Sequence, residues 1–206
     1  MHYDPRVDPK PAPLKYNPLN ALVGPRPIGW ITTVDPEGRI NLAPFSYFNA
    51  FSSDPPIVAF GPNARPSGGS KDTLVNVRAV PEFTASVVSA ELAVAMNDTS
   101  RESPYGFDEM AAAGLAPAAS TRVRPPRVAA ARAALECRVF DIVALPASRD
   151  GRTSHIVIGE VVGIYIDDAL ILPNGRVDSL ALAQVARLGY NDYTNVERLY
   201  EMRRPD

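Results

Sequence analysis

Residues 25–33, PRPIGWITT, and residues 41–49, NLAPFSYFN, predict two strands joined by a short turn. Half-buried strands alternate apolar and polar side chains, so that one face meets the core and the other meets water. The polar positions here carry only short uncharged groups, on Thr32, Thr33, Ser46 and Asn49. Such groups suit a neutral ring system or a phosphate. Threonine favours strands whatever surrounds it, so an ordinary Thr-rich strand pair stays open at this point.

The composition is that of a globular chain with balanced charge. Its 206 residues, 46% of them hydrophobic, are enough for one domain with a sizeable core. The formal net charge of -2 lacks the basic footprint of a nucleic-acid or membrane-surface protein. No apolar run approaches the ~20 residues needed to cross a bilayer, and the proline-rich start does not resemble a signal peptide. We therefore expect a cytoplasmic protein with no nucleic-acid or membrane partner.

Prolines and short β-prone segments predict a mainly β fold. The 21 prolines punctuate the chain and exclude long helices. Evenly spaced strands favour a closed or nearly closed antiparallel barrel over a parallel doubly wound sheet. The expected strands are residues 28–34, 40–48, 57–61, 83–89, 135–145, 154–166 and 169–172, the last two joined by a turn at Asp167-Asp168. The expected helices are residues 71–80, 91–97, about 107–112 and about 195–202.

Two segments offer groups that could receive an anion. Residues 68–73, GGSKDT, start a predicted helix with Ser70 as its N-cap. Backbone N–H groups there, with the Lys71 ammonium and the Thr73 hydroxyl, suit a terminal phosphate, although the order is not that of a P-loop. The other segment is an arginine cluster that could receive a dinucleotide or form a solvated face: Arg122, Arg124, Arg127 and Arg132.

Several familiar chemistries lack their residues in this chain. The two histidines and one cysteine cannot form a nitrogen and sulfur metal site, so no metal is expected. The single cysteine, Cys137, can close no intramolecular disulfide, and its apolar alternation predicts a buried strand residue. Neither a G-x-G-x-x-G fingerprint nor a G-x-S-x-G elbow occurs. The sequence therefore favours chemistry in which the protein supplies no nucleophile.

Several motifs stand in an order shared with a known family. They are RPI-x-WITT at 26–33, NLAPFSYFN at 41–49, DPP at 54–56, KDT at 71–73, IGEVV at 158–162, and ARLG at 186–189 with Tyr193. This order resembles the flavin reductase-like family, which includes flavoredoxins. The resemblance implies a mainly β FMN-binding split barrel, an antiparallel Greek-key barrel with a few short helices, in one domain over residues 1–206. Its parts would be a 1–22 extension, a 23–190 barrel and a 191–206 C-terminal arm.

The resemblance also implies which residues hold the FMN. Thr32 and Thr33 would hydrogen-bond the flavin or its ribityl chain, and Lys71 and Thr73 would hold the phosphate. The flavin would be lined by Ser46, Tyr47, Phe48, Asn49, Ala50 and Ser52. The family is usually a homodimer with the flavin near the interface. Arg187, with Tyr190 or Tyr193, would complete the site from the same subunit or from the other one.

Two further positions carry open alternatives. The resemblance places His155 near the open face of the ring, where a nicotinamide or substrate would stack, as a candidate catalytic residue. A hydrogen-bonded strand histidine is the alternative interpretation. Tyr190 stands where the family often has a second glycine, which puts the close backbone approach there in question.

The implied function is an FMN-binding oxidoreductase. It would transfer hydride from NAD(P)H to the flavin and pass electrons to a partner oxygenase or a small acceptor. Hydride transfer needs stacked rings and exclusion of water, which agrees with the missing nucleophile. Two alternatives stay open: a flavoredoxin-like electron carrier without its own NAD(P)H site, and a barrel used for binding that has lost its cofactor.

Overall fold

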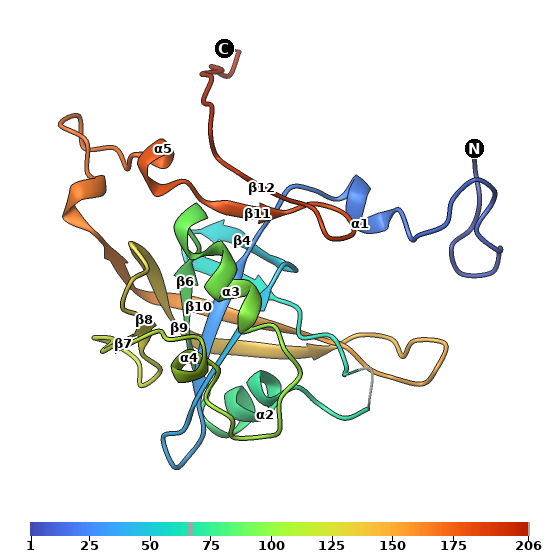
Figure 1. The fold of residues 1–206 in the computed structure, drawn as a ribbon, viewed down its shortest axis with the longest axis horizontal. Coiled ribbons are helices and arrows are strands. Elements are labelled where there is room, and N and C mark those ends of the chain that lie inside the picture. The colour runs from blue at the N-terminus through green and yellow to red at the C-terminus, as the bar shows by residue number, and fades with distance from the viewer. Residues whose placement is uncertain (66–67, 206) are drawn as a thin grey trace.

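A curled antiparallel sheet forms the body of the protein, which the computed structural model describes at residues 1–65 and 68–205 (Figure 1). Its strands are β2 Gly29–Val34, β3 Ile40–Phe45, β4 Phe48–Ser53, β5 Pro56–Phe60, β6 Glu82–Val87, β9 Ala133–Ala144 and β10 His155–Ile166. In space they follow the order β3-β2-β6-β9-β10-β5-β4, and each pair is antiparallel. The mainly β antiparallel architecture expected from the sequence is confirmed.

The two edge strands of the sheet, β3 and β4, are consecutive in the chain, and this brings the edges together. Only Ser46 and Tyr47 separate them. Phe48 of β4 packs onto Gly29 of β2, where a Cβ atom would lie 2.6 Å from the Phe48 ring, so a glycine is required there. Within the described residues, no ladder of backbone hydrogen bonds joins β3 to β4. The barrel is therefore split at this seam.

The barrel interior is an aromatic and aliphatic core. The rings of Phe45 and Phe60 lie 5.0 Å apart between centroids, and those of Phe60 and Phe83 lie 5.2 Å apart. Cys137 of β9 is fully buried in this cluster, as the sequence predicted, and burial raises the pKa of its thiol. A second cluster around Trp30 lies beneath the helical side of the sheet. Both clusters fix the strands that carry the site.

Short helices lie on and around the sheet. They are α1 Leu19–Leu22, α2 Asp72–Ala79, α3 Ala93–Asp98 preceded by the 3-10 helix η1 Ala90–Leu92, α4 Glu109–Ala112, the 3-10 helix η2 Asp168–Leu170, and α5 Ser179–Leu182. The helices expected near 71–80, 91–97 and 107–112 are thus confirmed. The predicted cap is wrong: Lys71, not Ser70, is the N-cap of α2, and its side chain makes no capping bond. None of the described helices has the length and apolar composition that a membrane crossing requires.

Two small sheets complete the fold. One is formed by β1 Arg26–Pro27, β11 Val185–Arg187 and β12 Tyr193–Asn195, and the other by β7 Pro117–Ala118 and β8 Arg127–Val128. The first sheet joins the N-terminal and C-terminal parts of the chain beside the barrel (Figure 1). From it the C-terminal residues extend away from the body.

Three expected elements are wrong. The expected strand 40–48 breaks after Phe45, because the chain passes there from one edge of the sheet to the other. The expected strand 169–172 is the 3-10 helix η2, because the Asp167 carboxylate accepts a hydrogen bond from the Ala169 N–H at 3.0 Å and favours a turn. The expected helix 195–202 begins inside β12, and residues 196–205 have no regular secondary structure.

Candidate functional site

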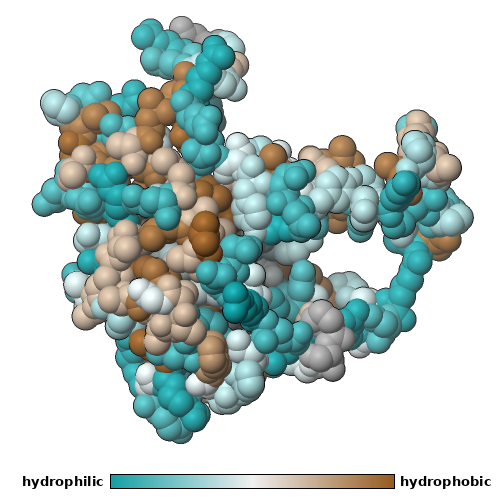
Figure 2. Space-filling view, in the orientation of Figure 1, coloured by the Kyte–Doolittle hydropathy of each residue, from teal (hydrophilic) through white to brown (hydrophobic). Residues whose placement is uncertain are grey.

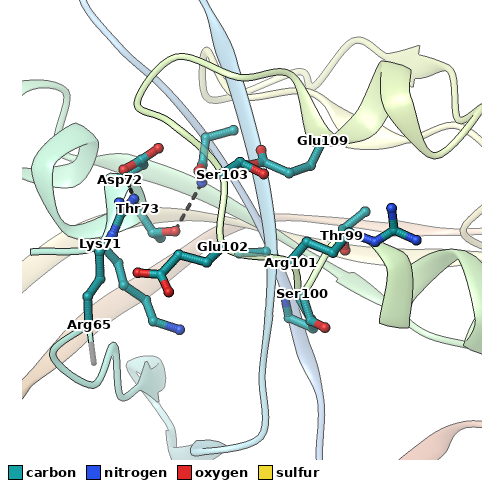
Figure 3. Close-up of a pocket in the computed structure, with 13 residues that line it drawn as sticks. Arg65, Lys71, Asp72, Thr73, Thr99, Ser100, Arg101, Glu102, Ser103 and Glu109 are labelled. Atoms are coloured by element: carbon teal, nitrogen blue, oxygen red, sulfur yellow. Dashed lines mark hydrogen bonds and ion pairs between the residues drawn. The ribbon is translucent and has the colours of Figure 1, made fainter. Parts of the chain in front are cut away.

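A polar cavity of about 300 Å³ lies where the start of α2 meets β3 and the segment between α3 and α4 (Figure 3). Lys71 and Thr73, both predicted to hold a phosphate, line it. The other lining residues are Asn41, Ala43, Pro44, Arg65, Asp72, Thr99, Ser100, Arg101, Glu102, Ser103 and Glu109. The structure thus brings together the two predicted anion-binding side chains, with a second cation, Arg65, beside them.

The charged side chains that line the polar cavity are partly buried, and their charges and their burial shift their pKa values. The Lys71 ammonium lies 5.3 Å from the centre of the Phe45 ring, and burial and then the charge of Arg65 lower its pKa. Arg65 itself forms an ion pair with Asp72. Burial raises the pKa of Glu109, whose carboxylate accepts a hydrogen bond from the Leu42 N–H at 3.2 Å. An anion bound near Lys71 and Arg65 would relieve the repulsion between these two cations.

A buried network of amides and hydroxyls holds α2 against the β2–β3 hairpin. The Asn41 amide donates to the hydroxyls of Thr33 at 3.2 Å and Thr73 at 3.0 Å. The Asn76 amide donates to the same Thr33 hydroxyl at 3.1 Å and accepts from the Tyr105 hydroxyl at 3.1 Å. The network therefore sets the position of Thr73, and with it the start of α2.

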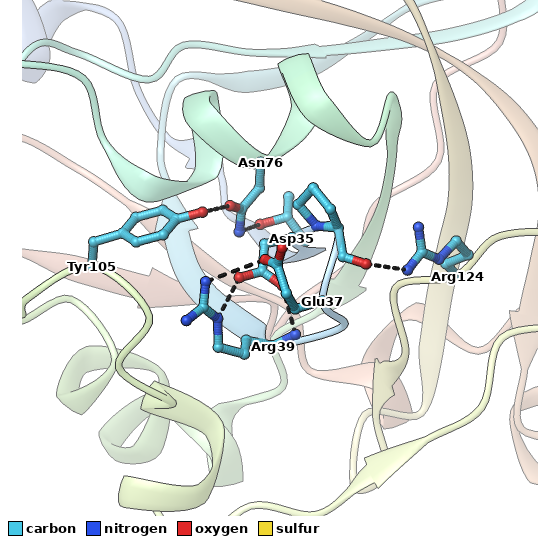
Figure 4. A network of polar contacts seen from close by, with 8 residues as sticks. Asp35, Glu37, Arg39, Asn76, Tyr105 and Arg124 are labelled. Carbon is cyan, nitrogen blue, oxygen red and sulfur yellow. Dashed lines mark hydrogen bonds and ion pairs between the residues drawn. The ribbon is translucent and has the colours of Figure 1, made fainter.

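The same network continues to the hairpin turn (Figure 4). The Arg39 guanidinium lies 5.7 Å from the centre of the Tyr105 ring and forms an ion pair with Asp35, which is almost fully buried. Arg124 donates to the Pro36 carbonyl at 3.4 Å from the opposite side. These contacts tie the turn between β2 and β3 to the segment that closes the polar cavity.

An apolar cavity of about 510 Å³ lies at the seam of the barrel. Four predicted flavin-lining residues, 46–49, line it, and so does His155 from the start of β10. The remaining lining residues are Val23, Gly24, Pro25, Arg26, Pro27, Phe51, Ala59, Phe60, Gly61, Asn63, Leu145 and Ile156. Aromatic and aliphatic walls with a few polar groups are typical of a site for a planar ring.

Residues close together in the chain line the two cavities. Ala43 and Pro44 near the end of β3 line the polar cavity, and Ser46 and Tyr47 of the β3–β4 connection line the apolar cavity. The segment after β5 also lines both, through Gly61 and Asn63 on the apolar side and Arg65 on the polar side. One ligand with a ring at one end and an anion at the other matches this pair of cavities.

His155 combines both interpretations left open by the sequence, because it is a strand residue and also lines the apolar cavity. Its Nε2 atom lies 2.9 Å from the Nη2 atom of Arg78, the basic residue in the last turn of α2. Its Nδ1 atom is buried and has no hydrogen-bond partner within the described chain. Burial and then the Arg78 charge lower the pKa of His155.

Arg26 is a buried cation in the wall of the apolar cavity, and the sequence indicates no role for it beyond its place in a motif. It is 8% exposed, and its guanidinium donates to backbone carbonyls, those of Asn20 at 2.5 Å, Leu188 at 2.8 Å and Val23. Its Nε atom has no partner among the residues that the structure describes. No ion pair with a carboxylate is formed by Arg26 within the same residues. Arg26 therefore places an unneutralised positive charge beside the cavity.

The remaining predicted site residues lie elsewhere in the chain. Thr32 and Thr33 are fully buried in the sheet and line neither cavity. Ala50 and Ser52 of β4 line neither cavity, whereas Asn49 and Phe51 line the apolar one, as expected when alternate residues of a strand face the same side. No arginine of the 122–132 cluster lines either cavity.

The C-terminal candidates gather at a separate hollow beside α3. Arg187 and Tyr193 both line that hollow, and the Arg187 guanidinium lies 4.4 Å from the centre of the Tyr193 ring. Tyr190 holds a left-handed backbone with φ of 57°, the conformation that glycine adopts freely. Its ring packs on Tyr16 at 5.4 Å between centroids. Within one chain these residues are therefore apart from the two neighbouring cavities.

Residues missed from the sequence include Asn41, Asn63 and Arg65. Asn41 stood in the quoted motif, and its amide could have been recognised as a partner for the buried threonines. Arg65 and Asn63 lie in the segment after β5, and no sequence motif there indicates that they belong to a site. Among the described residues, no group of three or more His, Cys, Asp or Glu side chains is arranged to hold a metal ion.

Comparison with known proteins decides the family. A family model described as "Flavin reductase like domain" matches residues 24–181. The chain belongs to the flavin reductase like family. This membership confirms the resemblance read from the ordered motifs. A relative from Deinococcus radiodurans, described as an uncharacterized protein, is 40% identical over 210 residues, which cover 98% of this chain and 89% of the relative.

Solved structures of similar fold confirm the architecture of this flavin reductase like chain. Nitrilotriacetate monooxygenase component B from Bacillus cereus superimposes with a TM-score of 0.83 at 27% identity, covering 94% of this chain and 100% of that one. The 2-nitrobenzoate 2-nitroreductase from Pseudomonas fluorescens superimposes with a TM-score of 0.77 at 28% identity, covering 90% and 88%. The likeness extends over nearly the whole flavin reductase like chain in both comparisons.

Proposed function

We propose that this protein binds FMN and acts as an oxidoreductase that takes hydride from NAD(P)H. The observation that carries the proposal is the adjacency of the two cavities. The segments 43–49 and 61–65 each contribute some residues to the apolar cavity, which has room for a ring, and others to the polar cavity. The polar cavity is also lined by Lys71 and Thr73. FMN has a planar ring at one end and a phosphate at the other, and it matches both.

The side chains present fit this cofactor. Lys71, Arg65 and Thr73 supply cations and a hydroxyl for a phosphate, and the two cations repel each other as they stand. Arg26 and His155 line the apolar cavity, and each has a buried nitrogen with no hydrogen-bond partner among the described residues, which we propose as a donor to a ring. When bound, FMN supplies the hydride-accepting chemistry of its isoalloxazine ring. The chain would bind it, orient it and exclude water.

Arg26 has a specific role in this proposal. A cation in a cavity of low polarity stabilises negative charge on a bound ring more strongly than it would in water. Because no carboxylate neutralises Arg26 among the described residues, its charge is available for this purpose. We assign to Arg26 the stabilisation of the reduced cofactor.

The electron acceptor is proposed from the two solved relatives. One is the component of a monooxygenase and the other is a nitroreductase, so we propose that the electrons pass to a partner oxygenase or to a small acceptor. The second candidate function is a flavoredoxin-like electron carrier without an NAD(P)H site. The proposed use of NAD(P)H agrees with the cytoplasmic location expected from the sequence.

Anaerobic addition of NADH or NADPH to the FMN-loaded protein should bleach the visible flavin spectrum within seconds. The physical reason is that His155 and the aromatic walls leave a cavity in which a nicotinamide can stack on the ring. Stopped-flow absorbance measures the rate. Bleaching by a reduced carrier protein, with neither pyridine nucleotide effective, would assign the chain to the second candidate function.

We also propose that the chain is a homodimer. Figure 2 shows hydrophobic side chains gathered around the segment that contains η2 and α5, where Ile171, Leu172 and Leu180 are exposed. The C-terminal residues extend from the body beside this segment (Figure 1) and expose Leu199, Tyr200 and Met202. A second copy would cover these groups and could bring its Arg187 and Tyr193 toward the cavities. Within each copy, we propose a single domain over residues 1–206 that consists of a 1–22 extension, a 23–190 barrel and a 191–206 C-terminal arm.

Sedimentation equilibrium should give about twice the chain mass of 22.2 kDa. Replacing Leu199, Tyr200 and Met202 together with serine should weaken the dimer, since these exposed apolar side chains would lose their buried partner surface. Serine at Val7, which is 75% exposed at the other end of the chain, is the matched control and should leave the mass unchanged. A wild-type protein that sediments at 22.2 kDa at every concentration would exclude the dimer.

A further inference from the structure

The contact between Arg78 and His155 fixes the position of the imidazole proton. A guanidinium has only N–H donors and no acceptor, so the 2.9 Å contact requires His155 Nε2 to accept. The accepting nitrogen cannot carry a proton. The neutral ring must therefore carry its proton on Nδ1, and a protonated ring would lose the hydrogen bond and face a second cation.

The N–H group on Nδ1 is the hydrogen-bond donor of His155 that has no acceptor among the described residues. It is buried and has no hydrogen-bond partner within the described residues, although the ring lines the apolar cavity. A buried N–H group without a partner costs stability, and native proteins keep such groups mainly where function requires them. A ligand carbonyl is the chemistry that would satisfy it.

We propose that Arg78 is a positioning residue that holds His155 as a neutral Nδ1–H donor to a carbonyl oxygen of a heterocyclic ring bound in the apolar cavity. The identity of that ring rests on the proposed function, whereas the tautomer of His155 does not depend on it. Arg78 lies on α2, the helix whose first turn lines the polar cavity. The two ends of α2 would thus serve the two ends of one ligand.

The surrounding charges agree with a neutral ring. Burial and then the Arg78 charge lower the pKa of His155, so its charged form is disfavoured. Arg26 and Tyr47 are the other ionisable side chains that line the cavity. Neither is a carboxylate that would stabilise an imidazolium.

Two-bond ¹H–¹⁵N correlation spectra of the full chain test the tautomer without any ligand. The chain has two histidines, and the exposed His2 serves as the control in the same spectrum. We expect a protonated Nδ1 and an unprotonated Nε2 for His155 at pH 7.5. Arg78→Gln should shift the proton toward Nε2 and raise the pKa of His155, and leave His2 unchanged. A wild-type ring protonated on Nε2, or spectra that Arg78→Gln does not alter, would overturn the proposal.

Binding measurements test the donor. The side-chain amide of asparagine can place its nitrogen near the position of imidazole Nδ1, so His155→Asn keeps a donor that does not depend on Arg78. Arg78→Gln should weaken binding about threefold to tenfold in the wild-type background, because one hydrogen bond contributes about 0.5–1.5 kcal/mol. It should have no effect in the background that carries His155→Asn.

Two titrations, called the first and second arm of the experiment, distinguish which ligand supplies the carbonyl. FMN is titrated into the cofactor-free protein, and NAD⁺ is titrated into the FMN-loaded protein. A loss in the first arm assigns the carbonyl to the flavin, and a loss in the second assigns it to the nicotinamide carboxamide. Equal losses in both backgrounds, or no loss in either arm, would contradict the role of His155 as donor. Failure of wild-type protein to bind FMN would instead overturn the proposed function, because the spectra of the free protein do not depend on it.

Discussion

Lys71→Ala should lower the affinity for FMN by about tenfold to a hundredfold, because a hydrogen bond to a charged group contributes about 1.5–3 kcal/mol. The Lys71 ammonium stands in the polar cavity beside Arg65, over the Phe45 ring, and burial already lowers its pKa. The charge of Glu102, which lines the same cavity, opposes this lowering, and a phosphate would add a second anionic partner for Lys71. Quenching of FMN fluorescence measures the affinity.

Two controls separate the charge from the packing. Lys71→Met keeps the apolar stem against Phe45 and should lose as much affinity as alanine does. Arg138→Ala removes an exposed charge that lies outside both cavities, and should change the affinity little. The circular dichroism spectrum should be unchanged in all three variants. Full retention of FMN by Lys71→Ala would remove this side chain from the site.

Thr33→Val should lower the free energy of unfolding by about 2 kcal/mol, since each buried donor left unsatisfied costs about 1–3 kcal/mol. The Thr33 hydroxyl is the common acceptor for the amides of Asn41 and Asn76. Valine has nearly the same shape and accepts no hydrogen bond. Equilibrium unfolding in urea measures the loss.

The neighbouring residue provides a matched control. Thr32 is as fully buried as Thr33, but its hydroxyl has no hydrogen-bond partner in the part of the chain that the structure describes. Thr32→Val should therefore leave stability unchanged or raise it, because an unpaired buried hydroxyl is removed. Equal losses in the two variants would show that the hydroxyl network does not hold α2 to the sheet.

The sequence predicted most of the barrel because its strands have clear local patterns. β2, β6 and β10 alternate or run apolar between turn residues, and the structure has strands there. The break between β3 and β4 was missed because Ser46 and Tyr47 do not interrupt a β-prone run. The expected C-terminal helix failed because residues 196–205 show the spacing of a helix but pack on little of their own chain.

The site was predicted unevenly for a physical reason. Lys71 and Thr73 follow from the chemistry of a helix start, which is local in sequence. Arg26 could not be predicted, because its burial depends on carbonyls contributed by Asn20 and Leu188, which are far from each other in the chain. The pairing of Arg78 with His155 likewise joins two elements that only the fold brings together.

FMN titration of the full chain, followed by quenching of flavin fluorescence, tests the central claim most directly. The two neighbouring cavities predict saturable quenching at one FMN per chain, with a dissociation constant of about 1 μM or below, which corresponds to about 8 kcal/mol of binding free energy. A folded protein that shows no saturable quenching at concentrations of about 100 μM, where binding of about 5.5 kcal/mol would still be seen, would contradict it.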